Sequence, residues 1–134
     1  MQSVIIIDNE YITLRYLPDK KIIHHTIHKP FDSEVGSEAM VAGVAVLKEH
    51  GACKWLSDDR QNGPLSLDMI NSSVVWGPAM VAAGWKYWAN VVPQEIAAAA
   101  TLAPVIEALY GFGLRMMVFT DVEEALQWLD KMEC

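Results

Sequence analysis

The sequence predicts an α/β fold built on a mixed sheet, with an N-terminal antiparallel meander followed by βαβ units and with helices packed on the sheet. Near the start, three strand-like segments are joined by short connections, which favours antiparallel pairing. From about residue 32 onward, helical and strand-like periodicities alternate, which is typical of parallel strands joined by helices. A length of 134 residues with 52% hydrophobic residues predicts one globular domain over residues 1–134.

The meander is expected to contain three strands. Val4–Asp8 is a short apolar run, and Tyr11–Leu17 alternates between its two faces. Pro18-Asp19 predicts a turn, and Lys21–His28 is rich in β-branched residues, as strands are.

Helices and strands alternate through the rest of the chain. Asp32 or Ser33 can cap a helix that runs to about His50 and stops at Gly51, and close approach to the sheet would explain its two glycines, Gly36 and Gly43. The remaining strands are expected at Ala52–Leu56, Trp85–Val92 and Arg115–Phe119. Ser66 caps a helix from Leu67 to about Val75, which Gly77-Pro78 should break or restart, and a helical region runs from Pro93 to Gly111 with a fresh start near Thr101 and Pro104. Asp121 caps the last helix, with Glu124 completing a capping box and with Val122, Ala125, Leu126 and Leu129 buried.

Composition argues against several function classes. The formal net charge is −7 and no cluster of Lys or Arg is present, so neither nucleic acid nor an anionic membrane surface is an expected partner. The longest N-terminal apolar run, Val4–Ile7, is too short for a signal peptide or a membrane span, so we expect a cytoplasmic protein. Cys53 and Cys134 lie in no C-x-x-C motif, and we expect one buried and one exposed free thiol.

Three segments carry a resemblance to a known family. They read KWLSDDR at Lys54–Arg60, GWKYW at Gly84–Trp88 and VFTDVEEALQWL at Val118–Leu129. Together with the element order, they resemble the SpoIIAA-like group of small bacterial proteins, which is related to the STAS domain of anti-sigma-factor antagonists. The resemblance covers most of the chain and implies a STAS-like fold and a regulatory, protein-binding role.

The resemblance also raises the question of a switch. In the antagonists, a serine at the start of the helix after a central strand is phosphorylated and thereby controls binding to a partner. The family's Asp-Ser-Ser/Thr-Gly motif is absent here; by position the nearest hydroxyl is Ser66, and Ser57 is the second candidate. The related CRAL-TRIO fold implies a different function, in which an apolar or lipid-like ligand lies between sheet and helices.

The loop after the Ala52–Leu56 strand is the candidate partner-binding or anion-binding site. It contains Ser57, Asp58, Asp59 and Arg60, and Ser66 follows at the head of the next helix. Ligands of open α/β sheets meet the carboxyl ends of the strands, and a helix start favours an anion. The alternative is an ordinary strand exit, in which Asp and Ser bond to nearby amides and Arg60 pairs with an acid.

Aromatic residues suggest a second site. Trp76, Trp85 and Trp88 either pack in the core or line a pocket for a small apolar ligand, and they could also form a dimer surface.

The sequence predicts neither a metal site nor catalysis. His24 and His28 would share a strand face, but four strand residues span roughly 13 Å, which is too far for one metal ion. Adjacent Asp58 and Asp59 point differently, and no Ser-His-Asp or Cys-His arrangement is evident. We therefore expect a non-catalytic, cofactor-free module that binds a protein partner, or alternatively a carrier or sensor of a small apolar ligand.

Overall fold

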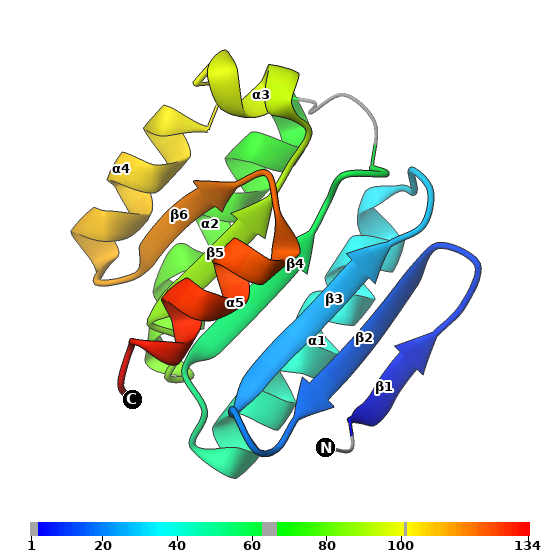
Figure 1. The fold of residues 1–134 in the computed structure, drawn as a ribbon, viewed down its shortest axis with the longest axis vertical. Helices are drawn as coiled ribbons and strands as arrows, with labels where there is room; N and C mark the ends of the chain where they lie inside the picture. The colour runs from blue at the N-terminus through cyan, green and yellow to red at the C-terminus, as the bar shows by residue number, and fades with distance from the viewer. Residues whose placement is uncertain (1–2, 63–66, 101) are drawn as a thin grey trace.

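Six strands form one sheet in the computed structural model, which describes residues 3–62, 67–100 and 102–134, without the side chains of Ser33 and residues 67–74. The strands are β1 (Val4–Asp8), β2 (Ile12–Leu17), β3 (Ile22–Ile27), β4 (Lys54–Asp58), β5 (Tyr87–Val91) and β6 (Arg115–Phe119). They lie in the sheet in chain order (Figure 1). The pairs β1–β2 and β2–β3 are antiparallel, and β3 to β6 are parallel. The predicted mixed α/β sheet is thus confirmed.

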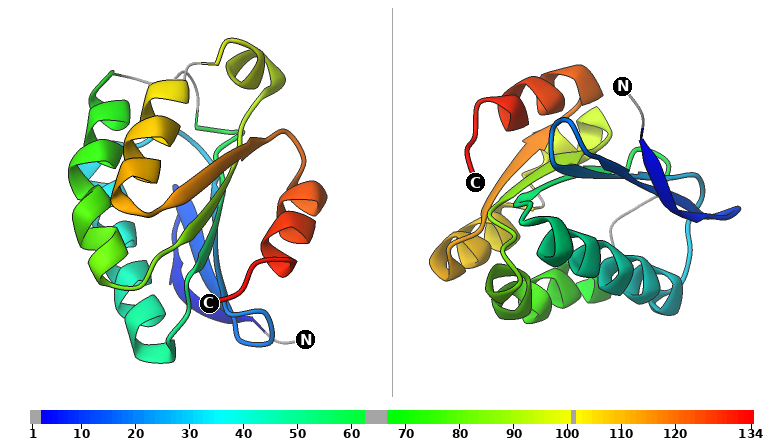
Figure 2. Two further views of the ribbon diagram at one scale, coloured as in Figure 1. Left: turned by 90° about the vertical axis from the view of Figure 1, so that its left-hand side faces the viewer. Right: turned by 90° about the horizontal axis from the view of Figure 1, so that it is seen from below.

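Helices cover the two faces of the sheet unequally. They are α1 (Ser33–His50), α2 (Leu67–Ala82), α3 (Gln94–Ala98), α4 (Ala103–Phe112) and α5 (Val122–Asp130). Figure 2 shows α1, α2 and α4 on one face and α5 on the other. Because α5 lies mainly over the β4–β6 half, most of the same face of β1–β3 carries none of the helices described (Figure 1).

The larger core lies between the sheet and the three helices on its first face. Trp55, Trp85 and Trp88 are buried there, and the rings of Trp55 and Trp85 stack with their centroids 4.3 Å apart. A Cβ atom at Gly43 of α1 would collide with the Trp55 ring, so the expected close approach to the sheet holds at this glycine. Gly36 instead faces Phe31, which precedes α1.

The smaller core lies under α5. Asp121 caps this helix, but its Oδ1 accepts from the backbone N–H of Glu123 and not from that of Glu124 as a capping box would require. Ala125 and Leu129 are fully buried against Ile22, Leu56, Ala89 and Val91. The predicted buried stripe is confirmed, with Val122 and Leu126 at its partly buried margin.

The strand β4 begins and ends two residues later than predicted. The N–H of Ala52 bonds back to the carbonyl of Leu47 as part of the α1 cap, so this residue does not join the sheet. Ser57 and Asp58 pair in register with β3 and β5 instead. They are therefore buried members of the strand and not its exit.

The helix α2 is continuous through Pro78, where a break was predicted. A proline inside a helix removes one hydrogen bond, and packing on both sides of it can offset that loss. Gly77 lies against Phe112 and Leu109 of α4, and Met80 is buried. The helix is therefore packed on both sides of Pro78. The fresh helix start near Pro104 is confirmed, but α4 continues past Gly111 to Phe112, and Gly113 is its cap.

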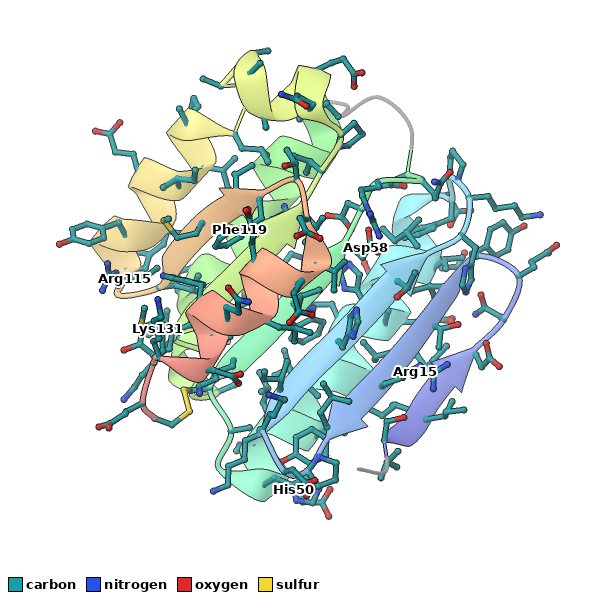
Figure 3. The ribbon with its side chains drawn as sticks, viewed as in Figure 1. Arg15, His50, Asp58, Arg115, Phe119 and Lys131 are labelled. Carbon is teal, nitrogen blue, oxygen red and sulfur yellow. A yellow bond between two sulfur atoms is a disulfide. The ribbon has the colours of Figure 1, made fainter. Side chains whose placement is uncertain are left out.

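The two cysteines form a disulfide, so the expectation of two free thiols is wrong. Cys53 and Cys134 are 81 residues apart in sequence, and their Cα atoms lie 5.6 Å apart. They meet because the segment after α5 returns to the start of β4, where Figure 3 shows the yellow sulfur–sulfur bond.

None of the helices within the described ranges has the length and apolar content needed to cross a membrane.

Candidate functional site

The candidate loop begins at the carboxyl ends of the parallel strands. His25, Ser57 and Asn90 occupy one row across β3, β4 and β5. Successive strand residues point to opposite faces, so Ser57 faces the large core while Asp58 faces the α5 side. Asp59 and Arg60 follow at the rim.

Arg60 is bound to Asp58 through two parallel hydrogen bonds. Its Nε donates to Oδ1 and its Nη2 donates to Oδ2, each at 2.8 Å. The Asp58 side chain is 10% exposed and that of Arg60 is 44% exposed. Burial raises the pKa of the Asp58 carboxyl, but the hydrogen bonds and charge of Arg60 outweigh burial and hold this pKa below its ordinary value. Both groups are therefore charged at neutral pH.

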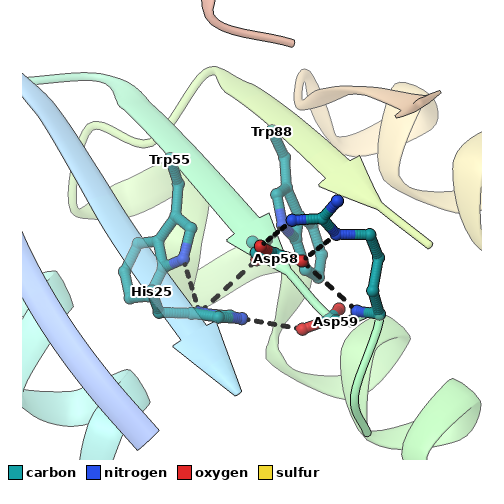
Figure 4. Close-up of polar contacts among 7 residues, drawn as sticks. His25, Trp55, Asp58, Asp59 and Trp88 are labelled. Carbon is teal, nitrogen blue, oxygen red and sulfur yellow. Dashed lines mark hydrogen bonds and ion pairs between the residues drawn. The ribbon is translucent and has the colours of Figure 1, made fainter. Parts of the chain in front are cut away.

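Asp59 is bound to His25 on the neighbouring strand. The distance from Asp59 Oδ1 to His25 Nε2 is 2.9 Å, and Trp55 Nε1 donates to His25 Nδ1 at 3.0 Å (Figure 4). An indole nitrogen can only donate, so Nδ1 carries no proton and Nε2–H donates to Asp59. The two bonds hold Asp59, and with it the start of the loop, against β3.

Ser57 completes this network from inside the core. Trp88 Nε1 donates to Ser57 Oγ at 2.7 Å, and Ser57 Oγ lies 3.5 Å from His25 Nδ1. Ser57, His25 and Asp59 thus form a Ser-His-Asp constellation that is not evident from the sequence. Ser57 is 0% exposed, however, and its oxygen is already engaged by Trp88. In this arrangement the hydroxyl cannot meet a substrate, and the three residues together with Trp88 tie β3, β4 and β5 together.

Two buried polar atoms beside this network have no hydrogen-bond partner among the described residues. They are His24 Nε2, on the α5 face, and Asn90 Oδ1, in the row of Ser57. Burial is the main cause that lowers the pKa of His24 from 6.5 to about 4. The neighbouring His25 and Arg15 also lower this pKa, and the Asp58 carboxylate raises it. His24 is therefore neutral at physiological pH.

The structure brings Ser57, Asp58, Asp59 and Arg60 together at one end of β4, but only Arg60 projects substantially from the rim. Ser66 lies outside the described residues. The predicted pairing of Arg60 with a neighbouring acid is observed. The site also includes His25 and Trp88, which sequence reasoning did not assign to it. Only the register of β3 and β5 against β4 could have identified them.

The three tryptophans that were candidates for a ligand pocket lie in two different environments. Trp85 and Trp88 belong to the large core, whereas Trp76 is 37% exposed. Trp76 lines a depression of about 220 Å³ between α1 and α2, whose lining residues are all apolar: Met40, Val41, Val44, Ala45, Trp76, Ala79 and Met80.

The histidines of β3 occupy separate environments. His24 belongs to the α5 face, and His28 Nε2 lies 2.7 Å from Thr13 Oγ1, beyond the end of the strand. Within the part of the chain that the structure describes, no group of three or more His, Cys, Asp or Glu side chains could hold a metal ion.

Compared with family models, with curated proteins and with solved structures, the chain matches none of them.

Proposed function

We propose that this chain is a non-catalytic, STAS-like regulatory module that binds another protein through the loop after β4, with Arg60 as its main contact. The observation that carries the proposal is the geometry of Arg60. The Nε–Nη2 edge of its guanidinium is fixed on Asp58, while the side chain remains 44% exposed.

The partner group that suits this geometry is a carboxylate or a phosphate. A guanidinium has five N–H groups, and Asp58 accepts from two of them. The edge formed by Nη1 and Nη2 bonds to no other residue that the structure describes, and this edge can hold an oxyanion with two parallel bonds. Because Asp58 already orients the arginine, less side-chain entropy is lost when a partner binds.

The same network supports a binding role over a catalytic one. His25 and Trp88 engage the buried Ser57, and Asp59 is held by His25. Each of these residues therefore shapes the rim without presenting a nucleophile to solvent. Burial of Ser57 also argues against its phosphorylation, so a serine switch in this protein would have to use another hydroxyl.

We also propose a cytoplasmic location. Cytosolic disulfides are usually transient or redox-sensing, so the location and the Cys53–Cys134 bond can be tested together. Free thiols would be trapped with an alkylating reagent in cells of the native source and counted by mass spectrometry.

The protein-binding proposal is tested by a pull-down from native lysate. Wild type, Arg60→Ala and Arg115→Ala would be compared, because Arg115 is also exposed but lies at the opposite end of the sheet (Figure 3). We expect a protein retained by wild type and by Arg115→Ala but lost with Arg60→Ala. Equal retention by all three variants would remove Arg60 from the contact.

A second candidate function is a carrier or sensor of a small apolar ligand. It is favoured by the apolar depression between α1 and α2 that Trp76 lines. Its volume of about 220 Å³ lies below the range typical of drug-sized ligands, so only a small ligand would fit. Native mass spectrometry of freshly purified protein distinguishes the functions: a co-purified small mass supports the carrier, and a bare monomer or homodimer supports the module.

A further inference from the structure

The C-terminal helix α5 is held on the sheet by one apolar face. It has nine residues, fewer than an isolated helix needs to be stable in water. Ala125 and Leu129 are fully buried on this face, and Val122, Leu126 and Trp128 add partly buried contacts. Its last residue, Asp130, pairs with Lys20 at 2.9 Å, but both side chains are exposed and such pairs contribute little.

The segment after α5 depends mainly on the disulfide. Residues 131–134 make backbone hydrogen bonds to Trp128 and Leu129 of α5 itself, and no hydrogen bond joins them to any other described element. Cys53, by contrast, is 2% exposed, and its carbonyl accepts the N–H groups of Lys86 and Tyr87. The disulfide therefore connects a buried position to a largely exposed segment that no hydrogen bond joins to another described element.

We propose that Cys53–Cys134 is a thiol–disulfide exchange site, and that its reduction by a dithiol releases α5 from the sheet. A thiolate of the dithiol attacks the sulfur of Cys134, because Cys134 is exposed and Cys53 is not. The sulfur–sulfur bond breaks, and the Cys53 sulfur leaves and takes up a proton. The second thiol of the reductant then displaces Cys134 as a thiol. The dithiol becomes a disulfide, and two electrons and two protons pass to the protein.

Release of α5 changes the surface over the β4–β6 half of the sheet. The helix covers Ile22, Leu56, Ala89 and Val91, which are fully buried beneath it. The helices α1, α2 and α4 all lie on the opposite face (Figure 2). Opening of the disulfide therefore exposes an apolar strip of the sheet, independently of whether Arg60 binds a partner.

Hydrogen exchange of the full chain tests this inference. Protein purified without reductant is compared with the same protein treated with dithiothreitol, and the Cys134→Ser variant serves as a permanent mimic of the open form. We expect no free thiol before treatment and two after it. We also expect amides of α5 to exchange about tenfold faster or more after reduction, with a much smaller change in β2 and β3. Cys134→Ser should show the same pattern and no further response to dithiothreitol.

Two outcomes would overturn the inference. The first is unchanged exchange in α5 after both thiols have been titrated, because the helix would then not depend on the disulfide. The second is an equal acceleration in every element, because the disulfide would then only constrain the unfolded chain and would not hold α5 locally.

Discussion

Acidification should destabilise the protein through His24, because folding buries this imidazole in its neutral form. Its pKa falls from 6.5 to about 4 on folding, and a tenfold change in proton affinity corresponds to about 1.4 kcal/mol. The unfolded chain binds the proton more tightly, so the free energy of unfolding falls as pH drops below 6.5. The loss attributable to His24 reaches about 3 kcal/mol and levels off below about pH 4.

Urea unfolding followed by tryptophan fluorescence measures this loss. At about pH 7 His24 contributes almost nothing, and by about pH 4.5 it should have removed about 2.5 kcal/mol. The His24→Gln variant lacks the titrating group and should lose correspondingly less stability between these pH values. The pairing of Asp58 with Arg60 affects stability at lower pH. A carboxyl whose pKa is depressed by folding loses its contribution to stability only when the pH falls below its ordinary pKa of 3.8. Equal pH dependence in wild type and His24→Gln would refute the reasoning.

Two further substitutions test the packing. Leu129→Ala should lower the free energy of unfolding by about 2–5 kcal/mol and the melting temperature by several degrees, because Leu129 of α5 is fully buried against the sheet; an unchanged melt would mean that the helix is not docked. Gly43→Ala should cost about 1–3 kcal/mol in urea unfolding because its methyl group collides with Trp55, whereas Gly111→Ala meets open space and should cost less than about 0.5 kcal/mol. Equal effects of the two glycine substitutions would contradict the close approach of α1 to β4.

Most of the fold could be predicted because periodicity and capping are local properties of the sequence. The alternation in Tyr11–Leu17 and the stripe of α5 both follow from side chains that must reach one core. The continuity of α2 through Pro78 could not be predicted, since it depends on packing against α4. The same holds for β4, whose first predicted residue, Ala52, is used by the cap of α1.

The candidate site was predicted only in part, because its geometry depends on strand register. The pairing of Arg60 with a neighbouring acid follows from their closeness in sequence. The bond between Asp59 and His25 joins residues 34 apart and requires β3 beside β4. The disulfide is a stronger case: Cys53 and Cys134 are 81 residues apart, and no local pattern indicates that the end of α5 returns to the start of β4.

The affinity of a captured partner for Arg60 variants tests the central claim most directly. Isothermal titration with wild type, Arg60→Lys and Arg60→Ala would be run under conditions where each variant is folded. This precaution is needed because loss of the arginine leaves the Asp58 carboxylate, which is 10% exposed, without its two charged bonds. Lysine keeps the positive charge but cannot offer a second guanidinium edge to an oxyanion. The predicted result is a loss of about tenfold or more in affinity for both variants, and wild-type affinity in Arg60→Ala would contradict the claim.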